Sequence, residues 1–196
     1  MALLAEKQPV FDAEAYLAWE DTQQERHEYI NGEVFAMVGV RQAHNIGSSN
    51  LLVALRRELK ETPCRVFVEA VKTRVEADNA FFYPDVVVTC DPRDRLTPQY
   101  VSYPILIVEI LSESTAAFDR GDKFAAYRRL ESLKEYGILD LKARRLEVFR
   151  RDETNHWVLY EYRPGEEVEF PSLGMKLAMD EILADTEEPP EAHENV

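Results

Sequence analysis

Two carboxylates stand in segments of the sequence that are otherwise apolar. Asp85 follows Pro84 at the start of the run VVVTC, and Glu109 interrupts the run ILIVEIL. An unpaired carboxylate in a protein core is costly, so a metal ion, a cationic side chain or hydrogen bonds must compensate each one. If the two strands are neighbours, both side chains can converge on one Mg²⁺ ion, which prefers oxygen ligands. Alternatively, each acid pairs structurally with an arginine or with backbone donors.

Three further side chains could join such a site. Glu28 lies in ERHEY, which the pattern places near the end of an N-terminal helical segment, where a glutamate is commonly solvated. Lys123 in DRGDKFAAY could place its ammonium beside a metal-bound water or a phosphate charge, although a helical lysine is commonly solvated too. His44 stands at the expected start of a helix, from which its imidazole could reach the same cleft.

The remaining reactive residues form none of the common catalytic or zinc-binding patterns. The four histidines lack the spacing of zinc ligands, and Cys64 and Cys90 are too far apart for a CxxC site. The sequence contains no GxSxG elbow, P-loop or GxGxxG motif. Ser112 and Ser114 follow Glu109 without an evident histidine partner, so a serine hydrolase is not expected.

The elements that must position these residues begin with helices and a tight turn. A short helix starts at Asp12, which is a suitable N-cap. A longer helix covers about 43–60, where apolar residues recur at three- and four-residue intervals before Pro63. Asn31–Gly32 marks a turn, because both residues tolerate positive φ.

The strand signals are strongest where the two acids stand. The runs 81–90 and 105–111 are typical of strands that are buried on both faces. A crossover helix after the second run leads to the further strand YGILD, and two amphipathic strands follow. The sequence therefore predicts an α/β (α+β) fold with helices around one mixed sheet of roughly seven or eight strands.

Length and composition are typical of a single domain. The 196 residues suggest a flexible lead-in over 1–9, one domain over 10–183 and an acidic tail over 184–196. No apolar run approaches the ~20 residues that span a bilayer, and the N-terminus lacks the features of a signal peptide. We read Cys64 and Cys90 as buried free thiols in a reducing compartment. These features predict a cytoplasmic protein without a membrane partner.

The net charge bears on possible partners. The value of -14 arises from 37 acids against 23 bases, whereas binding to nucleic acid draws on basic surface. Basic clusters nevertheless remain at Arg56–Arg57, Arg128–Arg129 and Arg144–Arg145. The charge therefore weighs against DNA binding without excluding it.

Several separate motifs together resemble a known family. The segments ERHEYINGEVFAM, YPDVVV, PILIVEILSESTAAFDRGDKFAAY and EYGILD, with His44 after the first, are similar to the Uma-type restriction endonuclease family of the PD-(D/E)XK nuclease superfamily. The resemblance covers roughly residues 10–183 and implies a restriction-endonuclease-like fold. It also implies that Asp85 and Glu109 are the two acids of the signature. The usual lysine position is Leu111 here, so the resemblance assigns that role to Lys123 in the next helix.

The activity implied by the resemblance is hydrolysis of DNA phosphodiester bonds. Asp85 and Glu109 would bind Mg²⁺, for which Mn²⁺ could substitute, and Glu28 would assist. Lys123 would orient or help deprotonate the attacking water, and a homodimer would bring two sites to two DNA strands. Two alternatives remain open, since sites are grafted on folds. One is a non-catalytic nucleic-acid-binding or protein-binding regulatory module, and the other is a metal-dependent hydrolase of small nucleotides.

Overall fold

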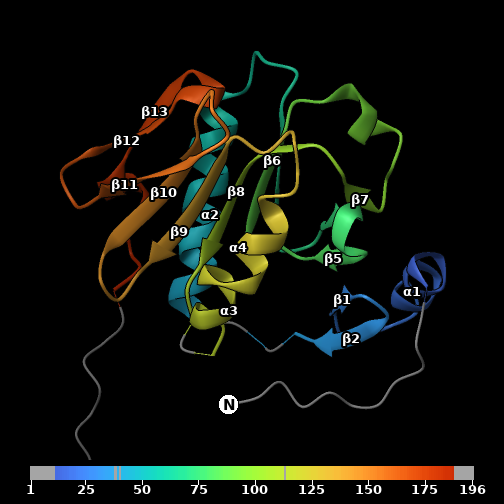
Figure 1. Cartoon of the computed structure of the whole chain (residues 1–196). Coiled ribbons are helices and arrows are strands. Elements are labelled where there is room, and N and C mark those ends of the chain that lie inside the picture. Colours follow the sequence, from blue (N-terminus) through green and yellow to red (C-terminus); the bar gives the residue numbers. More distant parts are fainter. Residues whose placement is uncertain (1–11, 38, 40, 113, 188–196) are drawn as a thin grey trace, which may run out of the picture.

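Two β-sheets are joined by the short segment that contains Tyr83, Pro84 and Asp85 (Figure 1). The computed structural model describes residues 12–37, 39, 41–112 and 114–187. The lead-in predicted over 1–9 lies outside these residues, as does most of the tail predicted over 184–196. Within the described part, five strands form the first sheet and six form the second.

The α/β (α+β) class is confirmed, but the prediction of a single main sheet was wrong. The run 81–90 is divided between β5 (Ala80–Phe82) in the first sheet and β6 (Val86–Thr89) in the second. Pro84 has no N–H group and cannot continue a hydrogen-bonded ladder. The chain therefore leaves one sheet at Pro84 and enters the other at Val86.

The first sheet has the spatial order β2-β1-β5-β4-β7 and is antiparallel except for the edge pair β4–β7. Its other strands are β1 (His27–Ile30), β2 (Glu33–Ala36), β4 (Lys72–Val75) and β7 (Tyr100–Val101). The predicted turn at Asn31–Gly32 joins β1 to β2, with positive φ at both residues.

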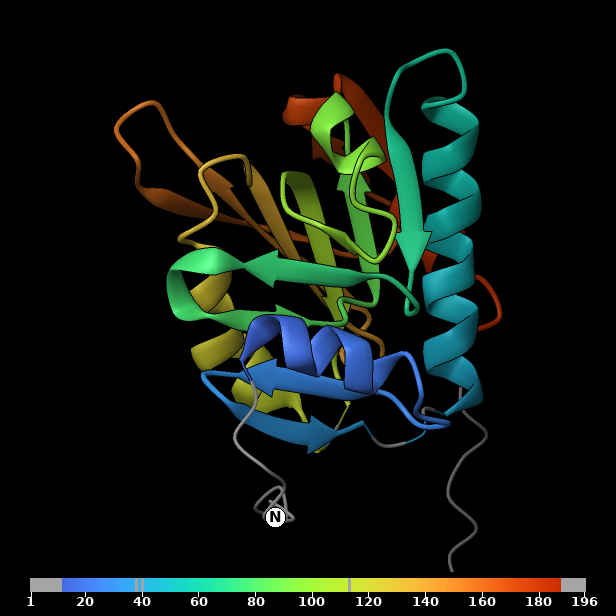
Figure 2. The ribbon, with the colours of Figure 1, turned by 90° about the vertical axis from the view of Figure 1, so that its right-hand side faces the viewer.

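Strand β1 corrects the prediction that Glu28 lies near the end of a helix. A two-residue Asn-Gly turn connects antiparallel strands, so the segment before it has to be extended. Tyr29 of this strand packs on Tyr16 of α1 (Ala13–Glu20), the helix that crosses the outer face of the sheet (Figure 2). Asp12 caps α1 as predicted, because its side chain accepts a hydrogen bond from the Ala15 N–H at 2.8 Å.

The second sheet has the spatial order β11-β10-β9-β8-β6-β3 and is antiparallel except for the pair β8–β9. Its other strands are β3 (Arg65–Val68), β8 (Pro104–Ile110), β9 (Glu135–Asp140), β10 (Arg145–Arg151) and β11 (Trp157–Tyr162). The predicted crossover between β8 and β9 is made by α3 (Ala116–Arg120) and α4 (Asp122–Tyr127). Strand β6 begins directly after Asp85, and β8 carries Glu109. These two strands are neighbours in the sheet.

Both faces of the second sheet are covered, as the apolar runs predicted. On one face, Val86 and Val88 pack with α2 (Gln42–Glu58), the hairpin β12–β13 and α5. On the other face, Val87 packs with α4 and with the inner face of the first sheet. The hairpin and the last helix are β12 (Glu167–Phe170), β13 (Met175–Ala178) and α5 (Met179–Ile182). The short 3₁₀ helices are η1 (Glu76–Asp78), η2 (Pro92–Arg95) and η3 (Pro171–Leu173). None of the helices in the described ranges combines the length and hydropathy that a bilayer crossing requires.

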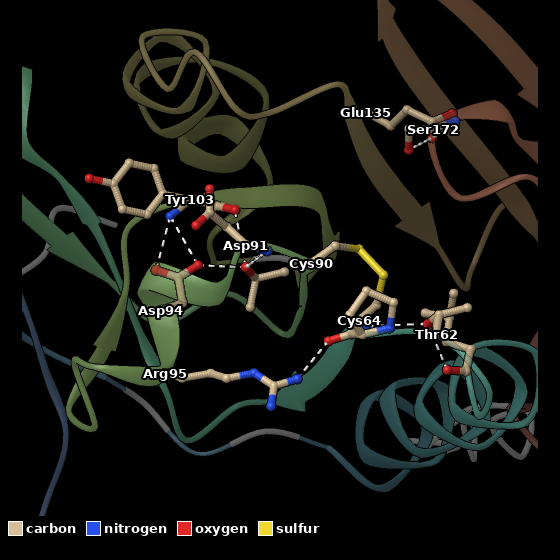
Figure 3. Close-up of a disulfide and its surroundings, with 12 residues drawn as sticks. Thr62, Cys64, Cys90, Asp91, Asp94, Arg95, Tyr103, Glu135 and Ser172 are labelled. Atoms are coloured by element: carbon tan, nitrogen blue, oxygen red, sulfur yellow. Dashed lines mark hydrogen bonds between the residues drawn. A yellow bond between two sulfur atoms is a disulfide. The ribbon is translucent and has the colours of Figure 1, made fainter.

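The prediction of two free thiols was wrong, because Cys64 and Cys90 form a disulfide (Figure 3). Arg65 of β3 pairs with Thr89 of β6, so the cysteines one residue beyond this pair lie opposite each other. The sequence did not show which strands pair and therefore did not show this contact. The argument for a reducing compartment rested on free thiols and loses that support.

We expect the disulfide to stabilise the fold. It closes a loop with a sequence separation of 26, for which chain entropy gives a contribution of about 3.5 kcal/mol. Reduction with dithiothreitol, or the double substitution Cys64→Ser with Cys90→Ser, should lower the free energy of unfolding by about that amount in urea titrations. Titration of two thiols in the unreduced, unfolded protein would contradict the assignment.

Candidate active site

The four residues predicted for the site gather where the two sheets meet α4. Glu28 comes from β1, Glu109 from β8 and Lys123 from α4, while Asp85 lies at the junction between the sheets. The Lys123 ammonium lies 3.0 Å from Glu28 Oε1 and 3.1 Å from Glu109 Oε1. One cation thereby joins a carboxylate of the first sheet to a carboxylate of the second.

Asp85 is held beside this cluster by strand pairing. Val86 pairs with Val108, which places Asp85 opposite Glu109 across β6 and β8. The Asp85 N–H donates to Glu109 Oε2 at 3.3 Å, and the Ile110 N–H donates to Asp85 Oδ2 at 2.6 Å. Backbone donors therefore fix the orientation of both carboxylates.

Glu28 is fixed in a similar way by the junction segment. Its Oε1 accepts a hydrogen bond from the Tyr83 N–H at 3.2 Å. On the other side of the junction, the Tyr83 hydroxyl donates to buried Glu20 at 2.8 Å, so the end of α1 anchors the same residue. The chain that leads into Asp85 is thus tied to both β1 and α1.

The position of Lys123 depends on a break in the crossover helix. Gly121 separates α3 from α4, and α4 begins one residue before Lys123. Phe124 stacks on Tyr136 of β9, with ring centroids 4.6 Å apart and planes within 9°. Leu111, at the usual lysine position, follows the end of β8 and packs, partly buried, against this same apolar cluster. The ammonium at the site is supplied by α4 instead.

The structure also adds residues that the sequence analysis did not assign. Asp119 of α3 lies 3.7 Å from the Lys123 ammonium, and the Tyr127 hydroxyl donates to Glu109 Oε1 at 3.1 Å. The four-residue spacing of Asp119 and Lys123 was visible in FDRGDK, but only the structure shows that the two side chains stay close across the break between α3 and α4. No sequence signal connected Tyr127 to Glu109.

His44, in the first turn of α2, reaches the site as the sequence suggested it could. Its Nε2 lies 3.0 Å from Asp85 Oδ1, and the residue is buried. Burial alone would lower the pKa of His44, but the hydrogen bond and the charge of Asp85 outweigh it and raise the pKa. His44 and the Ile110 N–H therefore engage the two oxygens of Asp85.

Burial dominates the electrostatics at the centre of the site. It raises the pKa of Glu109 well above the usual value, although the charge of Lys123 acts in the opposite direction. Burial would by itself lower the pKa of Lys123, yet Glu109, Glu28 and Asp119 together raise it well above the ordinary value. Lys123 consequently keeps its proton at neutral pH.

The donor set suits a hydrated divalent cation. Four carboxylates (Glu28, Asp85, Glu109 and Asp119) surround one ammonium, so negative charge is in excess. Across the described ranges, no three or more His, Cys, Asp or Glu side chains are arranged as a preformed metal cage. Mg²⁺ does not require one, since it is commonly bound through one or two carboxylates and several waters. Asp85 and Glu109 fit that manner of binding.

This fold and this site define a protein of the restriction-endonuclease-like class. A solved structure described as a putative nuclease from Anabaena variabilis has a TM-score of 0.73 to this chain. The likeness covers 88% of this chain and 97% of the other at 15% identity, which shows the shared fold.

Residues 13–180 match the Uma2 family, described as "Putative restriction endonuclease", and the chain belongs to this family. The resemblance in the sequence motifs is thereby confirmed. Two relatives, both uncharacterized proteins of Synechocystis sp. (strain PCC 6803), are 34% identical over 174 residues and 32% identical over 170 residues. The alignments cover 89% and 86% of this chain, and 92% and 96% of the relatives.

Removing the Lys123 ammonium should destabilise the fold in a pH-dependent manner. Lys123→Met leaves Glu109 buried without its charge partner, which typically costs about 3–5 kcal/mol near neutral pH. The folded-state pKa of Glu109 is raised above its unfolded value, so the folded protein takes up a proton first as the pH falls. Protonated Glu109 carries no charge, and the penalty should therefore shrink towards acidic pH.

The free energy of unfolding of wild type and variant is measured by urea titration at several pH values from neutral to acidic. Lys176→Met is a matched control, because Lys176 forms an exposed pair with Glu169 at 2.7 Å, and exposed pairs contribute little to stability. A Lys123→Met penalty that is the same at every pH would contradict the role assigned to Glu109.

Proposed function

We propose that the chain is a Mg²⁺-dependent endonuclease that hydrolyses DNA phosphodiester bonds at this site. The observation that carries the proposal is the buried Lys123 ammonium, held between Glu28 and Glu109 beside Asp85. Membership of a family described as restriction endonucleases supports the reaction class. Mn²⁺ could substitute for Mg²⁺, because both accept carboxylate ligands.

The chain's own residues have distinct roles in this proposal. Asp85 and Glu109 would hold the ion, and Glu28 would contribute directly or through a water. When bound, Mg²⁺ would supply a lowered pKa for the attacking water and positive charge beside the scissile phosphate. Backbone donors from Asp85 and Ile110 keep the two carboxylates oriented before any ligand arrives.

Lys123 acts as a charge stabiliser and positions water rather than removing its proton. An ammonium has three donors, and two point to carboxylates at 3.0 and 3.1 Å. Asp119, at 3.7 Å, is beyond hydrogen-bond distance, so the third donor remains for a water or a phosphate oxygen. Of the two roles that the sequence left open, orienting the water or helping to deprotonate it, we therefore propose the first, since the neighbouring carboxylates raise the pKa of Lys123.

The alternative with a specific observation in its favour is a non-catalytic binding module. The side chains of Glu28, Glu109 and Lys123 are only 12%, 2% and 7% exposed, so the ion pairs leave little open access. The net charge of -14 also opposes a polyanionic substrate. A hydrolase of small nucleotides would need no basic groove. It is tested by including small nucleotides among the substrates of the cleavage assay described below.

The proposed activity also implies a binding partner and an oligomeric state. DNA is the proposed partner, and a homodimer is the proposed assembly. A cytoplasmic location stays a prediction, which fractionation of the producing cells would test.

Metal binding should be visible as stabilisation. Mg²⁺ or Mn²⁺ that binds only the folded state at 100 times its Kd contributes about 2.7 kcal/mol and raises Tm by several degrees. Asp85→Asn should abolish this rise because it removes one charged ligand. Asp122→Asn is the control, since this exposed aspartate lies on α4 next to Lys123 but outside the cluster. An undiminished rise in Asp85→Asn would place the ion elsewhere.

Cleavage should depend on Lys123. Nicking of plasmid or single-stranded DNA with Mg²⁺ or Mn²⁺ is measured at low salt, where an acidic protein binds a polyanion best. Lys123→Ala should reduce the rate by about 10²-fold or more, because it removes charge stabilisation from the transition state, and should leave metal binding largely intact. Lys123→Arg should rescue poorly because of its different shape.

Lys134→Ala, at an exposed lysine, serves as the control for cleavage. Equal cleavage by wild type and Lys123→Ala would refute the assigned role. If the wild type cuts no substrate in a panel of duplex DNA, single-stranded DNA and small nucleotides, the binding module becomes the better account.

A further inference from the structure

An open cavity lies beside the end of α4, next to the end of β10 and the start of β11. Its volume is about 450 Å³, within the range of about 300–1,000 Å³ that is typical of sites for small ligands. The charged, amide and aromatic side chains that line it are those of Arg128, Arg129, Glu131, Arg151, Asn155 and Trp157. None of these residues belongs to the candidate active site.

The cavity is basic although the protein as a whole is acidic. Three arginines and one glutamate line it, whereas the chain carries a net charge of -14. In the other two basic clusters of the sequence, Arg57, Arg144 and Arg145 each bind at least one carboxylate. Among the arginines of the cavity, Arg129 alone has such a partner within the described ranges, namely Asp78. The cavity therefore keeps an excess of positive charge.

Arg128 and Arg151 carry this excess. The Arg128 guanidinium lies 5.1 Å from the centroid of the Phe124 ring and donates no hydrogen bond within the described ranges. Arg151 donates to the carbonyl oxygens of Arg128 and Glu131, which are neutral acceptors at the end of α4. Burial lowers the pKa of Arg151, and the charge of Glu131 only partly opposes this effect. A bound anion would compensate both guanidinium groups.

The remaining side chains suit a flat heterocycle with a polar edge. The Trp157 ring is held in place by Phe124, at a centroid distance of 5.4 Å, and by the Arg151 guanidinium, 4.8 Å from its centroid. Neither the indole N–H nor the Asn155 amide has a hydrogen-bond partner in the part of the chain that the structure describes. A nucleobase can pack against an indole, and an amide can both donate to and accept from the edge of a base.

We propose that this cavity binds one unpaired nucleotide of a nucleic-acid strand, with its phosphate on Arg128 and its base against Trp157. A guanidinium matches the geometry of phosphate oxygens and can bind two of them at once. The base must be unpaired, because bases within a duplex are covered by their stacked neighbours. The inference rests on the proposed function in taking nucleic acid as the substrate, but the binding itself needs neither metal nor cleavage.

Helix α4 connects the cavity to the candidate active site. Lys123 and Tyr127 are buried on its inner side, whereas Arg128 is exposed and faces the cavity. Arg128 follows Lys123 by five positions, which corresponds to a rise of about 7.5 Å along a helix. A strand that is anchored at the cavity is thus held close to the ammonium of the active site. The cavity would therefore favour substrates with unpaired nucleotides near the cleaved bond.

The fluorescence of Trp157 measures this binding directly. A single-stranded oligodeoxynucleotide should quench the indole emission in the presence of EDTA, which prevents metal-dependent cleavage. Trp157→Phe should lose the quenching, because the other tryptophan, Trp19, packs on His27 in a different part of the molecule. A blunt-ended duplex should quench much less than the single strand. Quenching that persists in Trp157→Phe, or that is equal for the duplex, would overturn the inference.

The contribution of Arg128 is tested by affinity. Arg128→Ala should weaken binding of the oligonucleotide about 10-fold or more, because a charge-assisted contact with phosphate is lost. The slope of log K against log salt should also become shallower by about 0.7. Arg56→Ala is the matched control, since it removes the same charge from an exposed arginine of α2. Equal weakening by both substitutions, or displacement of the oligonucleotide by an equal concentration of inorganic phosphate, would contradict a nucleotide site.

Two variants separate this cavity from the proposed active site. Asp85→Asn should lose the stabilisation by Mg²⁺ but bind the oligonucleotide at least as tightly as wild type in EDTA. Arg128→Ala should retain the stabilisation by Mg²⁺. A wild type that cleaves nothing would defeat the proposed activity and leave oligonucleotide binding at the cavity intact. Loss of oligonucleotide binding in Asp85→Asn would instead place the strand in the active site and refute the inference.

Discussion

The burial of Lys123 among carboxylates is the constraint on which the rest of the structure depends. Its ammonium binds Glu28 and Glu109 at 3.0 and 3.1 Å and therefore spans both sheets. Glu109 is buried, and a buried carboxylate is costly without such a partner. The helix break at Gly121 and the exit of the chain at Pro84 both deliver residues to this one cation. The junction of the sheets and the candidate site are consequently the same place.

Stability and reactivity compete for the same groups in this arrangement. The ion pairs that hold the two sheets together also occupy the oxygens that a metal ion would need. Asp85 differs from Glu28 and Glu109, because its two oxygens are engaged by His44 and by the Ile110 N–H. A cation that enters near Asp85 would weaken the hold of Glu109 on Lys123 and leave its ammonium more available to a phosphate. Binding of such a cation would therefore be linked to the contact between the sheets.

The sequence predicted which residues gather at the site better than it predicted the strand pairing that brings them together. An acid inside each apolar run was enough to single out Asp85 and Glu109, because burial of a charge demands compensation. Glu28 and Lys123 were weaker candidates, because they lie on elements with weaker signals, and the family resemblance then assigned them roles. What the sequence could not show was the pairing of distant strands. The division of the run 81–90 at Pro84, the strand before Asn31 and the contact of Cys64 with Cys90 all follow from long-range pairing.

The origin of Lys123 in α4 affects how the site can change during evolution or design. A lysine within a strand can move only by a shift of register, which would turn every other side chain of that strand to the wrong face. Here the neighbouring Phe124 rests on Tyr136, so the position of the ammonium follows from the fit of two aromatic rings. Substitutions at this stack could shift the cation by small steps while β8 and its carboxylate stay in place. The charge and the acids can thus be adjusted separately.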